Sequence, residues 1–188
     1  AMLSGMPRHA AVLRHAADKA GWGTRPLPAG RARGVALHES FDSIVAEVVE
    51  VSIASDGRTP RVHRVVCAID CGTVVNPGIV AQQMESGVVF ALSAALWGRI
   101  DIEGGVVRQR NFPDHPLLAL KDTPAIETHI VASERHPGGV GGRIDVGDPD
   151  AAKVRHLLGC FSVAGGSLGI GGALSQCVHF LRRDHRQC

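Results

Sequence analysis

The sequence predicts an α+β fold, in which mixed strands and hairpins pack with one long buried helix. Three runs rich in valine and isoleucine lie between residues 34 and 70, and an Asp-Gly turn signal separates the last two. A longer apolar pattern extends from Ile79 to about Trp97, which is the length of a helix and not of a strand. The 188 residues are 45% hydrophobic, enough to form a core for one domain or two small ones.

A first helix is predicted at the start of the chain. Pro7 suits the first turn of a helix, and Gly21 suits the position just past its end. Apolar residues recur between them at helical spacing, at Val12, Leu13, Ala16, Ala17 and Ala20.

Strands are predicted at residues 34–41, 44–54 and 61–70, followed by a strand near residues 126–132. Ser55-Asp56-Gly57 forms the predicted hairpin turn between the second and third strands. In the second strand the apolar alternation slips by one at Val48-Val49. This slip indicates either a β-bulge or a strand with both faces partly covered.

The long helix is predicted to begin at Asn76-Pro77, because Asn is a good N-cap and Pro favours the first helical position. Beyond Gly87 almost no polar face remains, so burial on most sides is expected. The polar residues cluster in its first half, at Gln82, Gln83, Glu85 and Ser86.

Composition excludes several classes of partner and site. The formal net charge is only +2 and aromatic residues make up 4% of the chain, so a nucleic-acid partner is not expected. The five cysteines, with no secretory pattern near the start, favour free thiols over a disulfide framework. Cys67 and Cys71 form a single C-x3-C pair, so no protein-held metal site is predicted.

The start of the long helix is the first candidate site. A helix N-terminus favours an anion such as a phosphate, and Gln82 and Gln83 would add hydrogen bonds to a heteroatom-rich ligand. The alternative is a capped structural helix, since caps occur in every fold. Asp70, just before it, has an equally plain interpretation as a carboxylate that stabilises a turn.

The loop Gly138-Gly139-Val140-Gly141-Gly142 is the second candidate, because glycines let a backbone approach a ligand closely. It fits neither the P-loop nor the dinucleotide-binding pattern, and a flexible loop is the alternative. The Gly165 to Gly172 cluster is a third candidate, but it does not fit the dinucleotide-binding pattern either. The uncharged run from Leu157 to Leu181 is long enough for a membrane-spanning segment, but its Gln, His, Ser and Gly content argues against one.

No Ser-His-Asp arrangement is predicted, because G-x-S-x-G is absent. His38, His63 and His129 are interpreted as ordinary strand or surface residues.

Several segments, taken in order, resemble the C-terminal part of a molybdopterin-binding large subunit of the xanthine dehydrogenase and aldehyde oxidoreductase family. The closest branch is similar to the isoquinoline 1-oxidoreductase beta subunit. The resemblance covers about residues 6 to 142. The segments that carry it are Gly34-Val35-Ala36-Leu37-His38-Glu39-Ser40-Phe41, Val65-Val66-Cys67-Ala68-Ile69-Asp70-Cys71-Gly72, Asn76-Pro77, Gln83-Met84-Glu85-Ser86-Gly87, Leu92-Ser93-Ala94-Ala95-Leu96, Gln109-Arg110-Asn111-Phe112 and Pro137-Gly138-Gly139-Val140-Gly141.

The resemblance implies a molybdenum hydroxylase that acts on an aldehyde or N-heterocycle. Its molybdenum is held by molybdopterin, expected in the cytosine dinucleotide form, and the protein supplies binding, orientation and a base. Iron-sulfur clusters are expected only on a partner subunit, because no cluster-type cysteine array occurs here. The same resemblance implies that the cofactor-binding residues are Asn76, Gln83, Gly138, Gly139, Val140 and Gly141.

Two departures from the family follow Gly141. The family's catalytic glutamate falls at Gly142, which cannot act as a base, so no catalytic residue is assigned and the isolated chain is expected to be inactive. Residues 143–188 form an atypical Gly- and Cys-rich tail, for which a shifted reading frame is one hypothesis; residues 1–142 form the predicted cofactor-binding domain.

The expected partners are a small-molecule substrate, an iron-sulfur small subunit and the N-terminal part of the large subunit, which this chain lacks. A membrane partner is not expected, and related subunits occur in the bacterial cytoplasm or periplasm. The alternative function is a non-catalytic assembly or interaction module derived from such a subunit.

Overall fold

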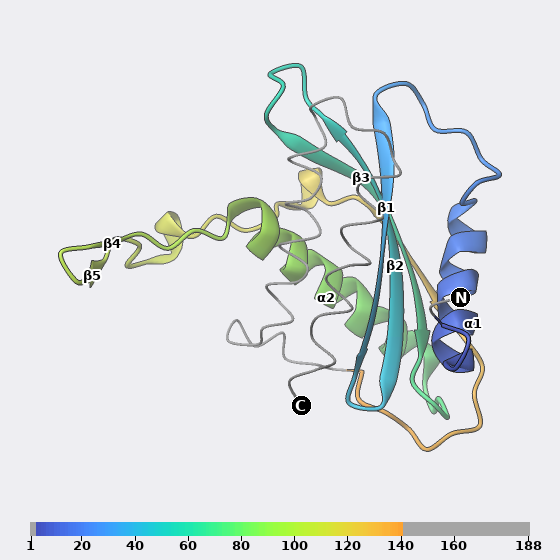
Figure 1. Cartoon of the computed structure of the whole chain (residues 1–188). Helices are drawn as coiled ribbons and strands as arrows, with labels where there is room; N and C mark the ends of the chain where they lie inside the picture. Colours follow the sequence, from blue (N-terminus) through green and yellow to red (C-terminus); the bar gives the residue numbers. More distant parts are fainter. Residues whose placement is uncertain (1–2, 141–188) are drawn as a thin grey trace.

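The computed structural model describes residues 3–140; Gly141, Gly142 and the predicted tail lie outside the described residues. The described chain forms three layers, with helix α1 (Pro7–Ala20) on one face of a four-stranded sheet and helix α2 (Pro77–Trp97) on the other (Figure 1). The predicted α+β fold is confirmed.

The sheet has the strand order β1-β2-β3-β6. Its strands are β1 (Arg31–Ser40), β2 (Ser43–Ile53), β3 (Pro60–Asp70) and β6 (Ala125–Ile130). β1, β2 and β3 pair in antiparallel fashion, whereas β6 pairs parallel to β3, so α2 lies in the crossover between these two strands. All four predicted strands are present, with ends shifted by a few residues.

Between α2 and β6 the chain forms small elements only. They are strands β4 (Ile102–Glu103) and β5 (Val106–Val107), and the 3-10 turns η1 (Phe112–Asp114) and η2 (Leu120–Asp122).

Of the two interpretations of the slip at Val48-Val49, the β-bulge is wrong for that position. The register between β2 and β3 shifts between Glu50 and Val51, because β3 carries an extra residue, His63. At Val48-Val49 the pairing is regular. These two valines are both buried because Val48 packs in the α1-side core and Val49 in the α2-side core, so the expectation of a strand covered on both faces is confirmed.

The core lies in two layers, one on each side of the sheet. On the α1 side, Val12, Ala16 and Ala20 pack against buried residues of β2 and β3. On the α2 side, Val88 and Leu92 pack against buried residues of the same two strands. Helix α1 ends as predicted, with Gly21 in the left-handed conformation at φ 66°.

The prediction that α2 is buried on most sides is wrong for the described part of the chain. Beyond Gly87, the range of that prediction, the buried residues are Val88, Leu92 and Ser93, whereas Phe90 is 47% and Trp97 36% exposed. The sheet covers only one side of the helix. The helix therefore has more apolar surface than the sheet buries. Helix α2 is also long and apolar enough to cross a membrane by length and composition alone. The core helices of other proteins meet the same criterion.

Candidate functional site

Three connecting segments meet at one end of the sheet. They are the β1–β2 turn at Phe41-Asp42, the turn that follows β3 at residues 71–73, and the segment 135–140 that follows β6. Because β3 and β6 are parallel, their carboxyl ends lie at the same edge. The start of α2 follows directly after the second of these turns.

The β1–β2 turn has an unusual backbone. Phe41 and Asp42 have φ values of 51° and 62°, the left-handed region that residues other than Gly, Asn and Asp seldom enter. This is the two-residue turn that matches the twist of a hairpin. The turn is held from outside, since Gly139 N–H donates to Phe41 O at 2.8 Å and Arg8 Nη2 donates to Asp42 O at 3.3 Å.

The glycine loop lies directly against this turn. A Cβ on Gly138 would lie 2.5 Å from Ser43 Oγ and 2.9 Å from the carbonyl carbon of Asp42, so only glycine fits there. The Gly138 N–H donates to Cys71 O at 2.9 Å. The Gly138 and Gly139 N–H groups therefore join the turns together and are not available as donors to a ligand.

Asp70 fixes the turn after β3. Its Oδ2 accepts a hydrogen bond from Arg8 Nε at 2.7 Å, and its Oδ1 accepts one from Gly72 N–H at 3.1 Å. The hydrogen bond from Arg8 is the main reason that the pKa of Asp70 lies below its ordinary value, although burial opposes it. The interpretation of Asp70 as a turn-stabilising carboxylate is confirmed.

The predicted start of α2 is also confirmed. Asn76 Oδ1 accepts a hydrogen bond from Ile79 N–H at 3.2 Å, and Pro77 has no N–H to satisfy. Within residues 3–140, the Gly78 N–H is then the one first-turn donor with no acceptor. Val80 of the next turn and Val140 of the glycine loop pack in one cluster, so the two candidate motifs lie together.

Gln83 lies on the outer side of α2, away from that cluster. Ile79, Gln83 and Phe90 follow one another at helical spacing, and all three are exposed. Gln82 is exposed as well. The structure thus brings Asn76, Gly138, Gly139 and Val140 to one end of the sheet and leaves Gln83 open beside it; Gly141 lies outside the described residues.

This end of the molecule fits a ligand rich in heteroatoms. Ser43 Oγ, beside Gly138, is buried with no hydrogen-bond partner among the described residues, while the amide of Gln83 and the N–H of Gly78 remain open. Within residues 3–140 no group of three His, Cys, Asp or Glu side chains is placed to hold a metal ion. The role of these residues toward a cofactor stays a prediction.

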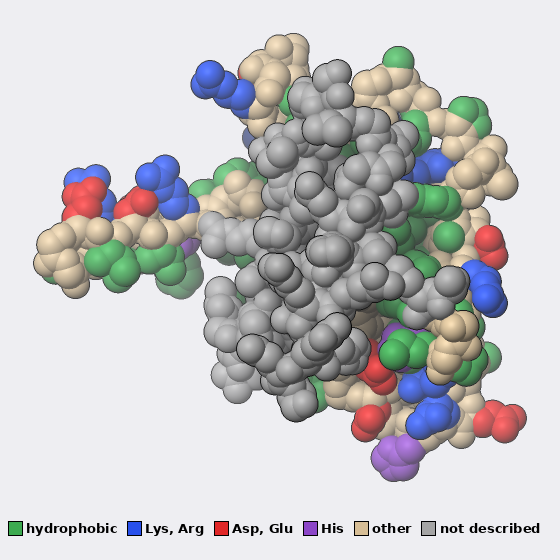
Figure 2. All heavy atoms as spheres, viewed as in Figure 1, with side chains coloured by type: hydrophobic (Ala, Val, Ile, Leu, Met, Phe, Trp, Pro, Cys, Tyr) green, Lys and Arg blue, Asp and Glu red, His purple; other side chains and the backbone are tan. Residues whose placement is uncertain are grey.

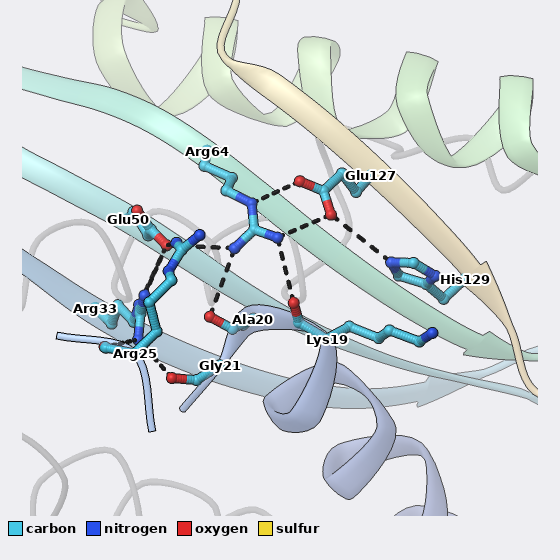
Figure 3. Close-up of polar contacts among 9 residues, drawn as sticks. All are labelled: Lys19, Ala20, Gly21, Arg25, Arg33, Glu50, Arg64, Glu127 and His129. Carbon is cyan, nitrogen blue, oxygen red and sulfur yellow. Dashed lines mark hydrogen bonds and ion pairs between the residues drawn. The ribbon is translucent and has the colours of Figure 1, made fainter. Parts of the chain in front are cut away.

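Sequence reasoning missed a charge network at the far end of α1 (Figure 3). Glu50 Oε1 accepts hydrogen bonds from three arginines, Arg25, Arg33 and Arg64. Burial by itself would raise the pKa of Glu50, but the Arg33 hydrogen bond and the charges of Arg25 and Arg33 outweigh burial and lower it.

Arg64 extends this network to β6 and to α1. It donates to Glu127 at 2.6 Å and 2.8 Å, and to the carbonyl of Lys19 at 3.2 Å (Figure 3). The network therefore caps the carbonyl end of α1 and ties it to the sheet. The sequence feature that could have revealed this network is Glu50, a glutamate within a valine-rich strand. A buried glutamate requires hydrogen-bonding or charged partners.

A second missed feature is a polar row on the α2 side of the sheet. Glu47 and Cys67 are paired across β2 and β3, with the Cys67 Sγ 3.6 Å from Glu47 Oε1. Burial raises the pKa of the Glu47 carboxyl and of the Cys67 thiol, so both favour their neutral forms. Thr128, next in the row on β6, has a buried hydroxyl with no hydrogen-bond partner among the described residues.

Comparison with known proteins adds independent findings. A family model described as the molybdopterin cofactor-binding domain matches residues 22–124. The chain is 38% identical over 142 residues to the isoquinoline 1-oxidoreductase subunit beta of Brevundimonas diminuta, covering 74% of this chain and 18% of that protein. It is 28% identical over 146 residues to a membrane-bound aldehyde dehydrogenase (pyrroloquinoline-quinone) of Gluconacetobacter polyoxogenes, with the same two coverages.

Solved structures show the same fold. The crystal structure of quinoline 2-oxidoreductase from Pseudomonas putida 86 superposes with a TM-score of 0.52 at 21% identity, over 60% of this chain and 15% of that one. A Cu,Mo-CO dehydrogenase superposes with a TM-score of 0.50 at 24% identity, over 62% of this chain and 15% of that one. The chain spans less than a fifth of the length of the curated relatives and of these two structures.

Proposed function

We propose a function for this chain from one premise: it belongs to the family of molybdopterin cofactor-binding domains. The resemblance drawn from the sequence motifs is thereby confirmed, and the relatives are oxidoreductases. The chain forms part of the molybdopterin-binding surface of a molybdenum hydroxylase large subunit that oxidises an aldehyde or N-heterocycle. The observation that supports this most is that Val80 of the α2 start and Val140 of the glycine loop belong to the same apolar cluster, which also contains Ile69 and Cys71.

The chain's own residues bind and orient the cofactor. The partial positive charge at the start of α2 and the Gly78 N–H favour an anionic group, such as the pyrophosphate of a cytosine dinucleotide form. The Gln83 side-chain amide donates to and accepts from ring heteroatoms. Gly138 and Gly139 hold the backbone that leads to Val140 against the turns at this end of the sheet. The bound molybdopterin supplies the redox chemistry.

Catalysis requires groups beyond this surface. Gly142 stands where the family has its glutamate, so this chain contributes no base, and it is inactive by itself. The iron-sulfur clusters and the rest of the large subunit come from outside residues 1–142. We divide the chain at Gly142, with residues 143–188 as a separate, atypical tail.

Cofactor content and turnover test this function together. The protein purified from its own cells with its associated subunits is expected to contain molybdenum and pterin, whereas the isolated chain shows no oxidation of aldehydes or N-heterocycles. Absence of molybdenum and pterin from the native assembly would contradict the proposed function. Turnover by the isolated chain would contradict the assignment of Gly142.

The assignment of Gly142 has a direct test of its own. In the native assembly, Gly142→Glu is expected to raise the rate of substrate oxidation by about a hundredfold or more, the typical contribution of a positioned base. Gly142→Gln is the matched control, because it has nearly the same shape and cannot take up a proton. Equal rates for the two variants would show that the base lies elsewhere.

A further inference from the structure

An arm extends from the end of α2. We call residues 98–117 the arm; it contains β4, β5 and η1 and lies away from the sheet (Figure 1). No element of the sheet pairs with β4 or β5, which pair only with each other.

One side of the arm is apolar. Ile102 and Val107 are directly paired across β4 and β5, so their side chains lie on the same face of the hairpin. Further exposed apolar side chains of the arm are those of Ile100, Phe112 and Leu117; Val106 is exposed as well, but it is paired with Glu103 and lies on the opposite face of the hairpin. In Figure 2 the hydrophobic side chains line one edge of the arm, and the charged side chains line the opposite edge.

The charges on the other side are paired within the arm. Arg99 Nε lies 2.9 Å from Asp101 Oδ1, and Arg108 Nε lies 2.9 Å from Glu103 Oε2. Gln109 bonds to both the backbone N–H and the carboxylate of Asp101. These four charged side chains are therefore satisfied within the arm.

A hairpin with two residues in each strand is not stable by itself in water. It becomes stable when a third strand, a helix or a packed surface covers one face. The turn at Asn111 is nonetheless well defined, with a capping box between Asn111 and Asp114. An arm with a defined shape, an apolar edge and internally paired charges is suited to a permanent interface, because obligate interfaces are the more hydrophobic ones.

We propose that the apolar side of the arm docks on the rest of the molybdopterin-binding large subunit, the part of the relatives' length that this chain does not span. This inference rests on the proposed function for the identity of the partner. The chain covers only 18% of its relative, so most of that subunit is available as a partner surface. The arm also continues the exposed apolar side of α2, since Trp97 directly precedes it and Phe90 lies two turns earlier.

Site-specific photo-crosslinking in the native cells tests this docking. A photoreactive amino acid replaces Ile102 or Val107 on the apolar side, and Glu103 or Arg108 on the polar side as matched controls. Crosslinked peptides are then identified by mass spectrometry. Positions 102 and 107 are expected to crosslink at least tenfold more to peptides homologous to the unmatched part of the large subunit than positions 103 and 108.

Other outcomes overturn the docking inference. They are crosslinks from positions 102 and 107 to a second copy of this chain, to an iron-sulfur protein or to no protein, and equal yields from both sides. Molybdenum and pterin are measured in the same purified assembly. Crosslinks from an assembly without molybdenum and pterin would support the docking of the arm and contradict the proposed function. Molybdenum and pterin in an assembly without these crosslinks would support the proposed function and contradict the docking.

Discussion

At the scale of single residues, both ends of α1, one of them beside the candidate site, depend on carboxylates that are paired with arginine. Asp70 holds Arg8 on α1 and the Gly72 N–H in the turn before α2. Glu50 holds the other end of α1 through its arginines. Each of these carboxylates is buried, so each needs its partners to offset the free energy lost on leaving water.

Replacing Asp70 is expected to destabilise the fold. Asp70→Asn keeps an acceptor for Gly72 but removes the charge that binds Arg8, and we expect the free energy of unfolding to fall by about 2 kcal/mol, typical of a hydrogen bond to a charged group. Urea unfolding measures this change. Asp18→Asn, on the exposed side of α1, is the control and is expected to change stability by less than roughly 0.5 kcal/mol. Equal effects of the two substitutions would show that the Arg8 pair does not hold the turn.

The lowered pKa of Glu50 predicts a loss of stability in acid. A carboxyl whose folded pKa lies below its unfolded value stabilises the fold above the unfolded value, 4.5 for Glu, and that stability is lost as the pH falls through the folded pKa. The free energy of unfolding of the wild-type chain is therefore expected to decrease below about pH 5. Glu50→Gln is expected to be less stable at pH 7 and to show a flatter profile. A profile as steep as that of the wild type would assign the acid sensitivity to other groups.

At the scale of elements, most of the fold could be predicted from the sequence. Helix α1, the strands and the start of α2 all have local signals, because caps, turns and apolar alternation are properties of neighbouring residues. The partners of Glu50 and Asp70 could not be predicted, because Arg33, Arg64 and Arg8 reach them from distant segments. The exposure of α2 was also unpredictable, because the apolar pattern does not reveal which surface covers it.

The glycines of the site and of α2 are expected to respond oppositely to alanine. At Gly138 a methyl group would meet Ser43 and the Asp42 backbone, so Gly138→Ala is expected to reduce the free energy of unfolding by about 2 kcal/mol or more. At Gly87 a methyl group meets nothing within 4 Å, and Gly87→Ala is expected to stabilise the helix by about 1 kcal/mol. Thermal and urea unfolding of both variants decide the point. Stabilisation by Gly138→Ala would mean that the loop does not pack on the β1–β2 turn.

At the scale of the whole molecule, the described chain has two surfaces on which the proposals depend. One end of the sheet carries the helix start and the glycine loop, with Gln83 exposed beside them. The exposed side of α2 and the apolar side of the arm are the surfaces that the rest of a large subunit would cover. Family membership could be inferred from ordered motifs, and a short hairpin around Glu103-Gly104-Gly105 is also readable from the sequence. The apolar side of the arm could not be predicted, because its residues are scattered along the sequence.

The central claim is that this end of the sheet binds molybdopterin, and the pterin content of two glutamine variants tests it most directly. Gln83 and its neighbour Gln82 are both exposed on α2, but only Gln83 is among the cofactor-binding residues that the resemblance implies, so Gln82→Ala is the matched control for Gln83→Ala. In the native assembly, Gln83→Ala is expected to weaken retention of molybdopterin by about tenfold, the loss of one strong hydrogen bond, while Gln82→Ala retains it. Equal pterin content in the two variants and the wild type would contradict the assignment of the site.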